Sequence, residues 1–167
     1  MSKRYKIRQK LISIGDDFWI ENEKGQKIFK VDGKVLRISK TLVFEDVNGR
    51  KLAQIKERLL SIKDTMVIED ANGRDIAIVK KALIAPLRDK WNVNVKDGED
   101  LVVQGNILDL EYSIKQGRKR VAEVSKKWFT ITDTYGVEVA GDQNDILILA
   151  IAVAVDMMAH DGERDNK

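Results

Sequence analysis

The segment Ile146–Val155, with the sequence ILILAIAVAV, decides the fold of this 167-residue chain. All ten of its residues are apolar, and Asp145 and Asp156 bracket it. A membrane-spanning helix needs about twenty apolar residues. At 1.5 Å per residue, this run reaches only roughly 15 Å. A helix that is apolar on every side must therefore be buried inside protein, and a β-barrel with the helix through its middle would bury it.

The local period of this segment suits a buried strand as well as a helix, because large and small apolar residues alternate over Ile151–Val155. The residues at its ends favour a helix. Asp142, Asn144 and Asp145 offer N-caps and acidic groups that complement the helix dipole. Gly162 is a suitable residue to follow the last turn. We therefore expect a helix over about residues 144–160.

The rest of the chain shows the two-residue period of half-buried antiparallel strands. Lys51–Lys56, Lys90–Val95 and Arg120–Ser125 alternate in this way. Asn48-Gly49 and Asn72-Gly73 predict tight type I′ hairpin turns, in which both central residues have positive φ. Turn signals recur often enough to predict about twelve short strands. So many strands favour a closed barrel or a sandwich over an open sheet.

A weak repeat supports a series of hairpins. Phe44–Arg50 returns 24 residues later as Ile68–Arg74, and Ile20–Gln26 is a looser copy 24 residues upstream. We expect a mainly β fold, an antiparallel closed barrel of about twelve strands around a central hydrophobic C-terminal helix. The barrel and helix form one domain over residues 1–160, and residues 161–167 form a polar tail.

Composition excludes several kinds of chemistry. The chain has no cysteine, so disulfides, thiolate metal sites and cysteine nucleophiles are excluded. Its one histidine, His160, is interpreted as a helix-capping or solvated side chain. The segment Asp70–Asp75 lacks the glycine and glutamate positions of a calcium loop, and no phosphate-binding glycine loop occurs. We expect no metal, no cofactor and no enzyme activity.

Charge indicates where an anionic ligand could bind. The net charge is only +3, but cations cluster in parts of the chain. Solvated strand faces are the simpler interpretation of these clusters, and that alternative stays open. The candidate anion-binding residues are Lys80, Lys81, Arg88, Lys90, Arg118, Lys119, Arg120, Lys126 and Lys127.

Four segments give the chain a recognisable likeness: Phe29–Lys34, Asp46–Ile55, Leu59–Asp64 and 146–158. Together, in this order, they resemble the LURP-one-related family, which belongs with Tubby C-terminal domains and phospholipid scramblases. The likeness covers roughly residues 5–160. It implies a twelve-stranded barrel around a hydrophobic C-terminal helix.

The functional implication of the resemblance is narrower. Tubby domains bind phosphoinositide headgroups at membranes. No Lys/Arg pair here matches their binding motif, so no binding residue is carried over. The cysteine-rich and proline-rich segments of scramblases are also missing, which argues against lipid scrambling.

The leading hypothesis is a non-enzymatic binding or scaffold domain that contacts anionic phospholipid headgroups or a protein partner. We expect it to be cytoplasmic and peripheral to a membrane, with no transmembrane span. One alternative is a small-ligand carrier or enzyme that uses a pocket at a barrel end. Another is weak nucleic-acid binding, which 27 acidic residues and an aromatic content of 6% disfavour.

Overall fold

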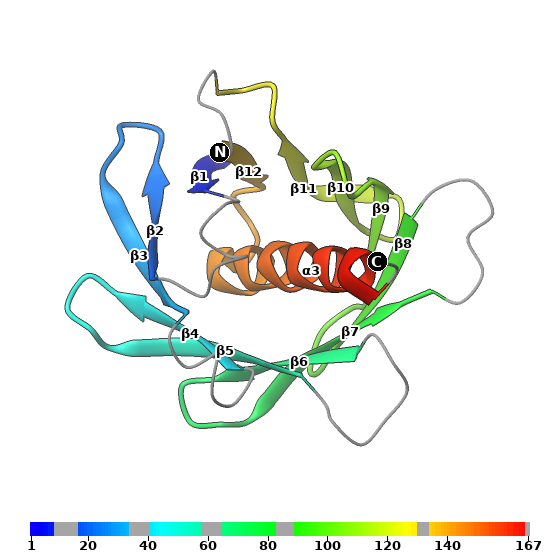
Figure 1. Cartoon of the computed structure of the whole chain (residues 1–167), viewed down its shortest axis with the longest axis horizontal. Coiled ribbons are helices and arrows are strands. Elements are labelled where there is room, and N and C mark those ends of the chain that lie inside the picture. Colours follow the sequence, from blue (N-terminus) through cyan, green and yellow to red (C-terminus); the bar gives the residue numbers. More distant parts are fainter. Residues whose placement is uncertain (9–16, 34–40, 58–64, 83–88, 130–133, 166–167) are drawn as a thin grey trace.

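The structure is a computed structural model that describes residues 1–8, 17–33, 41–57, 65–82, 89–129 and 134–165, with the backbone alone of Arg8, Asp89 and 160–165. In these ranges twelve antiparallel strands close into a barrel, in which sequence neighbours pair and β12 closes on β1 (Figure 1). The strands are β1 (Lys3–Arg8), β2 (Phe18–Asn22), β3 (Lys27–Asp32), β4 (Thr41–Asp46), β5 (Lys51–Glu57), β6 (Thr65–Asp70), β7 (Asp75–Lys81), β8 (Asp89–Val95), β9 (Leu101–Asn106), β10 (Glu111–Gln116), β11 (Lys119–Ser125) and β12 (Thr134–Val139).

The helix α3 (Asp145–Asp165) lies inside the ring of strands, as predicted (Figure 1). Every side chain from Ile148 to Val155 is at most 1% exposed. Asn144 caps the helix, because its side-chain oxygen accepts the Leu147 N–H at 3.1 Å. The helix continues to Asp165, so Gly162 lies within it and is not its C-terminal cap.

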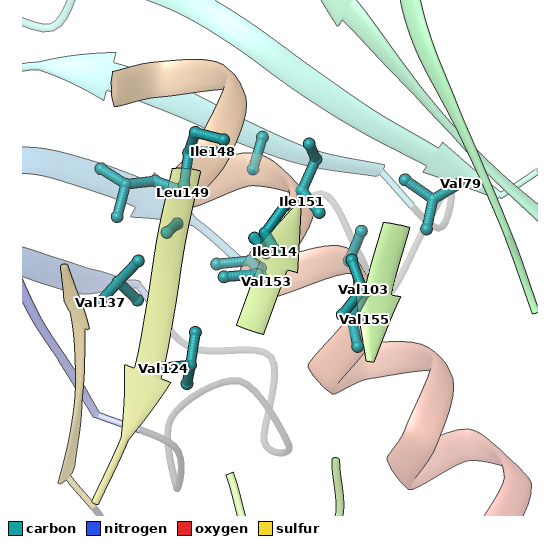
Figure 2. Packing of buried hydrophobic residues seen from close by; sticks show 14 of the residues in the cluster. Val79, Val103, Ile114, Val124, Val137, Ile148, Leu149, Ile151, Val153 and Val155 are labelled. Atoms are coloured by element: carbon teal, nitrogen blue, oxygen red, sulfur yellow. The ribbon is translucent and has the colours of Figure 1, made fainter. Parts of the chain in front are cut away.

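The inner face of the barrel consists of alternate residues of each strand. On β8, Trp91 and Val93 are buried, whereas Asn92 and Asn94 between and beyond them are exposed. Figure 2 shows the inward side chains of several strands gathered around Ile151, Val153 and Val155 of the helix. The apolar residues of the two-residue period are therefore the ones that point toward α3.

The 24-residue repeat corresponds to three hairpins with the same hydrogen bonds. In the β4–β5 hairpin, the Asp46 carboxylate accepts the N–H groups of Asn48 and Arg50, both at 2.9 Å. Gly49 has φ +82° and donates to the Asp46 carbonyl, whereas Asn48 does not have a positive φ. The prediction of type I′ turns was therefore wrong. The turn is a type I turn followed by a left-handed glycine and a β-bulge.

The same arrangement occurs 24 residues before and after this hairpin. Asn22 and Asp70 each accept two backbone N–H groups from the turn that follows, and Gly25 and Gly73 have φ +77° and +81°. Because one polar side chain fixes each turn, these hairpins share one geometry despite their loose sequence similarity.

Strand direction alternates around the barrel, so each rim collects one kind of strand end. We call the rim with the hairpin turns 23–26, 47–50, 71–74, 96–100 and 117–118 the turn rim. The far rim is the opposite rim, where odd-numbered strands end and even-numbered strands begin. The helix starts at the turn rim, after β12, and runs inside the barrel toward the far rim.

Polar groups enter the core near the far rim. Asp156 of the helix is 1% exposed. Burial raises the pKa of the Tyr112 and Tyr135 phenols, and the negative charge of Asp156 raises both further. Within the described ranges, the Tyr112 hydroxyl, the Trp91 indole nitrogen and the Thr134 hydroxyl are buried without hydrogen-bond partners.

The central position of α3 predicts the effect of a charge on it. Ala154 is 0% exposed, so Ala154→Asp should lower the free energy of unfolding by several kcal/mol. Thermal melting measures the loss. Ala71→Asp makes the same chemical change in an exposed turn and should melt close to the parent protein. Equal melting temperatures for the two variants would show that the helix is not enclosed.

Buried tyrosines predict a loss of stability in alkali. A phenol whose pKa is raised by folding stabilises the fold fully below pH about 10, and this contribution falls as pH rises through the folded pKa. Tyr112→Phe should melt no lower than the parent at pH 7, because the removed hydroxyl has no partner among the described residues. Above pH 10 the parent should lose up to about 1.4 kcal/mol per pH unit more than the variant. If the free energy of unfolding fell equally with pH in the two proteins above pH 10, the pKa of the Tyr112 phenol would not be raised by folding.

Candidate functional site

The structure divides the candidate cations between the two rims. At the far rim lie the residues at the end of β7, the start of β8 and just after β11: Lys80, Lys81, Lys90, Lys126 and Lys127. At the turn rim lie Arg118, Lys119 and Arg120, in and beside the β10–β11 hairpin. Arg88 falls outside the described residues. The candidates therefore form two separate groups and not one patch.

The two groups differ in their partners. At the turn rim, Lys119 forms an ion pair with Asp142 and Arg120 pairs with Glu123 at 3.1 Å, whereas Arg118 forms none with the described residues. The far-rim cations Lys80, Lys90, Lys126 and Lys127 form no ion pair with the part of the chain that the structure describes. The far-rim lysines thus keep their charge available to a ligand.

Lys81 differs from the other far-rim lysines. Its ammonium lies 5.5 Å from the centroid of the Trp91 ring, and Trp91 is 1% exposed. Lys81 occupies the inward-facing alternate position of β7, after Ala77 and Val79. It therefore stands at the mouth of the barrel, over the end of the core.

An apolar side chain projects from the same rim. The connection between β9 and β10 buries Ile107 and Leu110 but leaves Leu108 45% exposed. The Asn106 amide donates to the Asp109 carboxylate at 2.6 Å, and the Asp109 N–H donates back to the Asn106 side-chain oxygen at 3.3 Å. These bonds and the two buried neighbours hold Leu108 outward.

Leu110 has φ +55°, a left-handed conformation that is uncommon for leucine. Its side chain is nevertheless 0% exposed. Burial of Leu110 therefore offsets the backbone strain, and together they fix the turn that presents Leu108. Leu108 is not among the residues predicted from the sequence. Three of the four turn residues are apolar (Ile107, Leu108 and Leu110), and the sequence does not show which of them is exposed.

The lysines after β11 lie beside this turn. Glu111, the first residue of β10, accepts hydrogen bonds from the Ser125 hydroxyl at 3.0 Å and the Lys126 N–H at 3.1 Å. The Lys127 N–H donates to the same Ser125 hydroxyl at 3.1 Å. The backbone that carries Lys126 and Lys127 is therefore tied to the strand that follows Leu108. We call Leu108, Lys126 and Lys127 the far-rim cluster.

The tryptophans take part in packing. Trp91 is in the core, and the half-buried Trp19 has the Lys27 ammonium 5.2 Å from its ring centroid. The Arg4 guanidinium lies 4.3 Å from the ring centroid of the half-buried Trp128. A Cβ at Gly136 would approach a Trp128 ring atom to 2.5 Å, so that ring also lies against the backbone of β12. The protein's own contacts occupy ring surface that base stacking would use.

The described residues contain no group of three or more His, Asp or Glu side chains arranged to hold a metal ion. The side chain of His160 lies outside the described residues. A buried carboxylate occurs on β6, where Glu69 accepts a hydrogen bond from Gln54 and pairs with Lys56 at 3.4 Å.

A groove opens at the turn rim. It measures about 370 Å³ and lies between the start of β1 and the β2–β3 hairpin. The residues that line it are Ser2, Lys3, Arg4, Tyr5, Asn22, Glu23, Lys24, Gln26 and Ile28.

A closed twelve-stranded antiparallel barrel around a C-terminal helix places the chain in the class of Tubby C-terminal-like domains. The model of the LURP-one-related family matches residues 3–156. The chain belongs to the LURP-one-related family. Both the family and the barrel fold fit a non-enzymatic binding domain in general.

A solved structure supports the fold. A protein from Arabidopsis thaliana, known from an X-ray structure, matches with a TM-score of 0.71 and 20% sequence identity, over 95% of this chain and 91% of that chain. No curated protein matched the sequence. Among the described residues, no helix has both the length and the apolar character needed to cross a membrane.

Proposed function

We propose that this chain is a non-enzymatic binding domain that docks its far rim on an anionic phospholipid surface on the cytoplasmic side of a membrane. The observation that carries the proposal is the far-rim cluster, in which an exposed leucine stands beside two lysines that have no ion pair with described residues. The absence of cysteine suits a reducing compartment.

The physical basis is the sum of two weak attractions. Each lysine held close to an anionic bilayer contributes about 1 kcal/mol, and salt screens this contribution. Leu108 adds an apolar contact, because each Å² of apolar surface removed from water contributes about 25 cal/mol. Lys80, Lys81 and Lys90 extend the cationic surface along β7 and β8 of the same rim.

Vesicle flotation tests the proposal directly. Purified protein should float with vesicles that contain phosphatidylserine and remain unbound with pure phosphatidylcholine, and binding should weaken as salt rises. Duplex DNA added at low salt serves as a competitor. If the protein binds DNA at low salt but does not float with phosphatidylserine vesicles, nucleic-acid binding replaces the membrane proposal.

Charge reversal at each rim gives a matched comparison. Lys126→Glu/Lys127→Glu should weaken binding to phosphatidylserine vesicles by at least about thirtyfold, since two favourable contributions of about 1 kcal/mol are lost. Lys115→Glu/Arg118→Glu makes the same change in net charge at the turn rim, where both side chains are exposed. In this control only the lower net charge acts, so it should weaken vesicle binding by no more than about twofold. Equal losses in the two variants would mean that the far rim does not face the membrane.

The contribution of Leu108 is separable from charge. Leu108→Asp should reduce vesicle binding, whereas Val47→Asp should reduce it less. Val47 is 58% exposed and lies in the β4–β5 turn at the opposite rim, so the two variants make the same kind of change. Tryptophan fluorescence and melting temperature confirm that both variants fold. Equal binding by the two variants would remove Leu108 from the docking surface.

A further inference from the structure

The barrel closes between β1 and β2 through a very short pairing. β1 pairs with β12 over its whole length, from Lys3 to Arg8. It pairs with β2 only at Tyr5–Asn22 and Lys6–Glu21, and no other pair of neighbouring strands in the described ranges shares fewer than four positions.

The β2–β3 turn explains why this pairing stops. The Asn22 side-chain oxygen accepts the N–H groups of Lys24 at 3.0 Å and Gln26 at 2.9 Å. The chain therefore turns toward β3 directly after Asn22, the residue that pairs with Tyr5. The edge of Lys3 and Arg4 that faces β2 consequently has no neighbouring strand among the described residues, and the 370 Å³ groove lies along it.

The walls of the groove are already fixed. The Tyr5 hydroxyl donates to the Asp145 carboxylate at 2.5 Å, and the Lys3 ammonium donates to the same oxygen at 3.1 Å. On the opposite wall, the Asn22 amide donates to the Gln26 side-chain oxygen at 2.8 Å. Because these side chains are held before anything binds, little ordering cost opposes a ligand.

The chemistry of the groove favours an acidic, extended ligand. Its lining holds three cations, Lys3, Arg4 and Lys24, against one acid, Glu23. Lys3 and Arg4 pair with Asp145 and Glu138, whereas Lys24 forms no ion pair with the described part of the chain.

We propose that the groove binds an extended peptide segment of a partner protein, which pairs with the edge of β1 at Lys3 and Arg4 and brings an acidic side chain to Lys24. An added strand would provide neighbours for the backbone groups of this edge, and strand addition is a common mode of peptide recognition. A free anion would use the charge of Lys24 but not the strand edge. The groove lies at the turn rim, so this proposal is independent of membrane docking by the far rim.

Fluorescence anisotropy with the full chain tests the proposal. The probe is a fluorescein-labelled pentapeptide of alternating aspartate and valine, at low salt. It should bind, and the amide resonances of Lys3 and Arg4 should shift in NMR spectra of the titration. A peptide of the same sequence with N-methylated backbone nitrogens should not bind, because it cannot pair as a strand.

Two variants locate the site. Lys24→Glu should weaken binding by about fivefold or more, the factor that a partly exposed ion pair provides. Arg50→Glu reverses a charge in the next hairpin, outside the groove, and should leave binding unchanged. Failure of the aspartate–valine peptide to bind, equal binding of the N-methylated peptide, or equal effects of the two variants would overturn the proposal.

Discussion

The burial of an entirely apolar helix is the constraint on which this structure depends. Ile148–Val155 has no polar face to offer to water, so protein must surround it on every side. A sheet packed on one side would leave half of the helix exposed. A closed barrel covers it completely, and the closure also removes most of the unpaired edge that a sheet of this size would otherwise expose. One core therefore contains both the alternate apolar residues of the strands and the apolar run of the helix.

Because the helix occupies the barrel interior, the candidate binding surfaces lie at the two rims. Inward side chains such as Val79, Val103 and Val124 form one hydrophobic core with the helix (Figure 2). The two rims differ in the partners of several of their cations. At the turn rim, Lys3 and Lys119 form ion pairs with Asp145 and Asp142, and Asp145 also joins the helix to Tyr5 of β1. The far rim leaves Lys126 and Lys127 without such partners among the described residues and presents Leu108 beside them.

Most of the fold could be predicted from the sequence, because hydrophobic period and turn residues are local signals. The barrel, its twelve strands and its central helix were all confirmed. The turn type was not, because Asn48-Gly49 fits two turns and the choice depends on Asp46, which binds the turn from outside the pair. The end of the helix was also misplaced, since Gly162 is tolerated within it.

The candidate site could be predicted only in its residue types. Whether two cations share a rim depends on how many strands separate them, and an error of one strand moves a cluster to the opposite end. The sequence therefore could not separate Lys126 from Arg118, which lie at opposite ends of β11. The groove could not be anticipated either, because it results from the place where the pairing of β1 and β2 stops.

Polar groups at both ends of the apolar run 146–155 fix the position of the helix along the barrel. Burial of apolar surface has no direction, so a run such as ILILAIAVAV could slide by a turn inside its barrel at little cost. Asp145 meets Lys3 and Tyr5 at the turn rim, and Asp156 lies near Tyr112 and Tyr135 toward the far rim. A buried carboxylate is costly unless polar groups surround it, so a shift of the helix toward the turn rim would move Asp156 into apolar surroundings. A shift toward the far rim would separate Asp145 from Lys3 and Tyr5. The two aspartates thereby fix the position of the helix, and with it the strands that carry both rims.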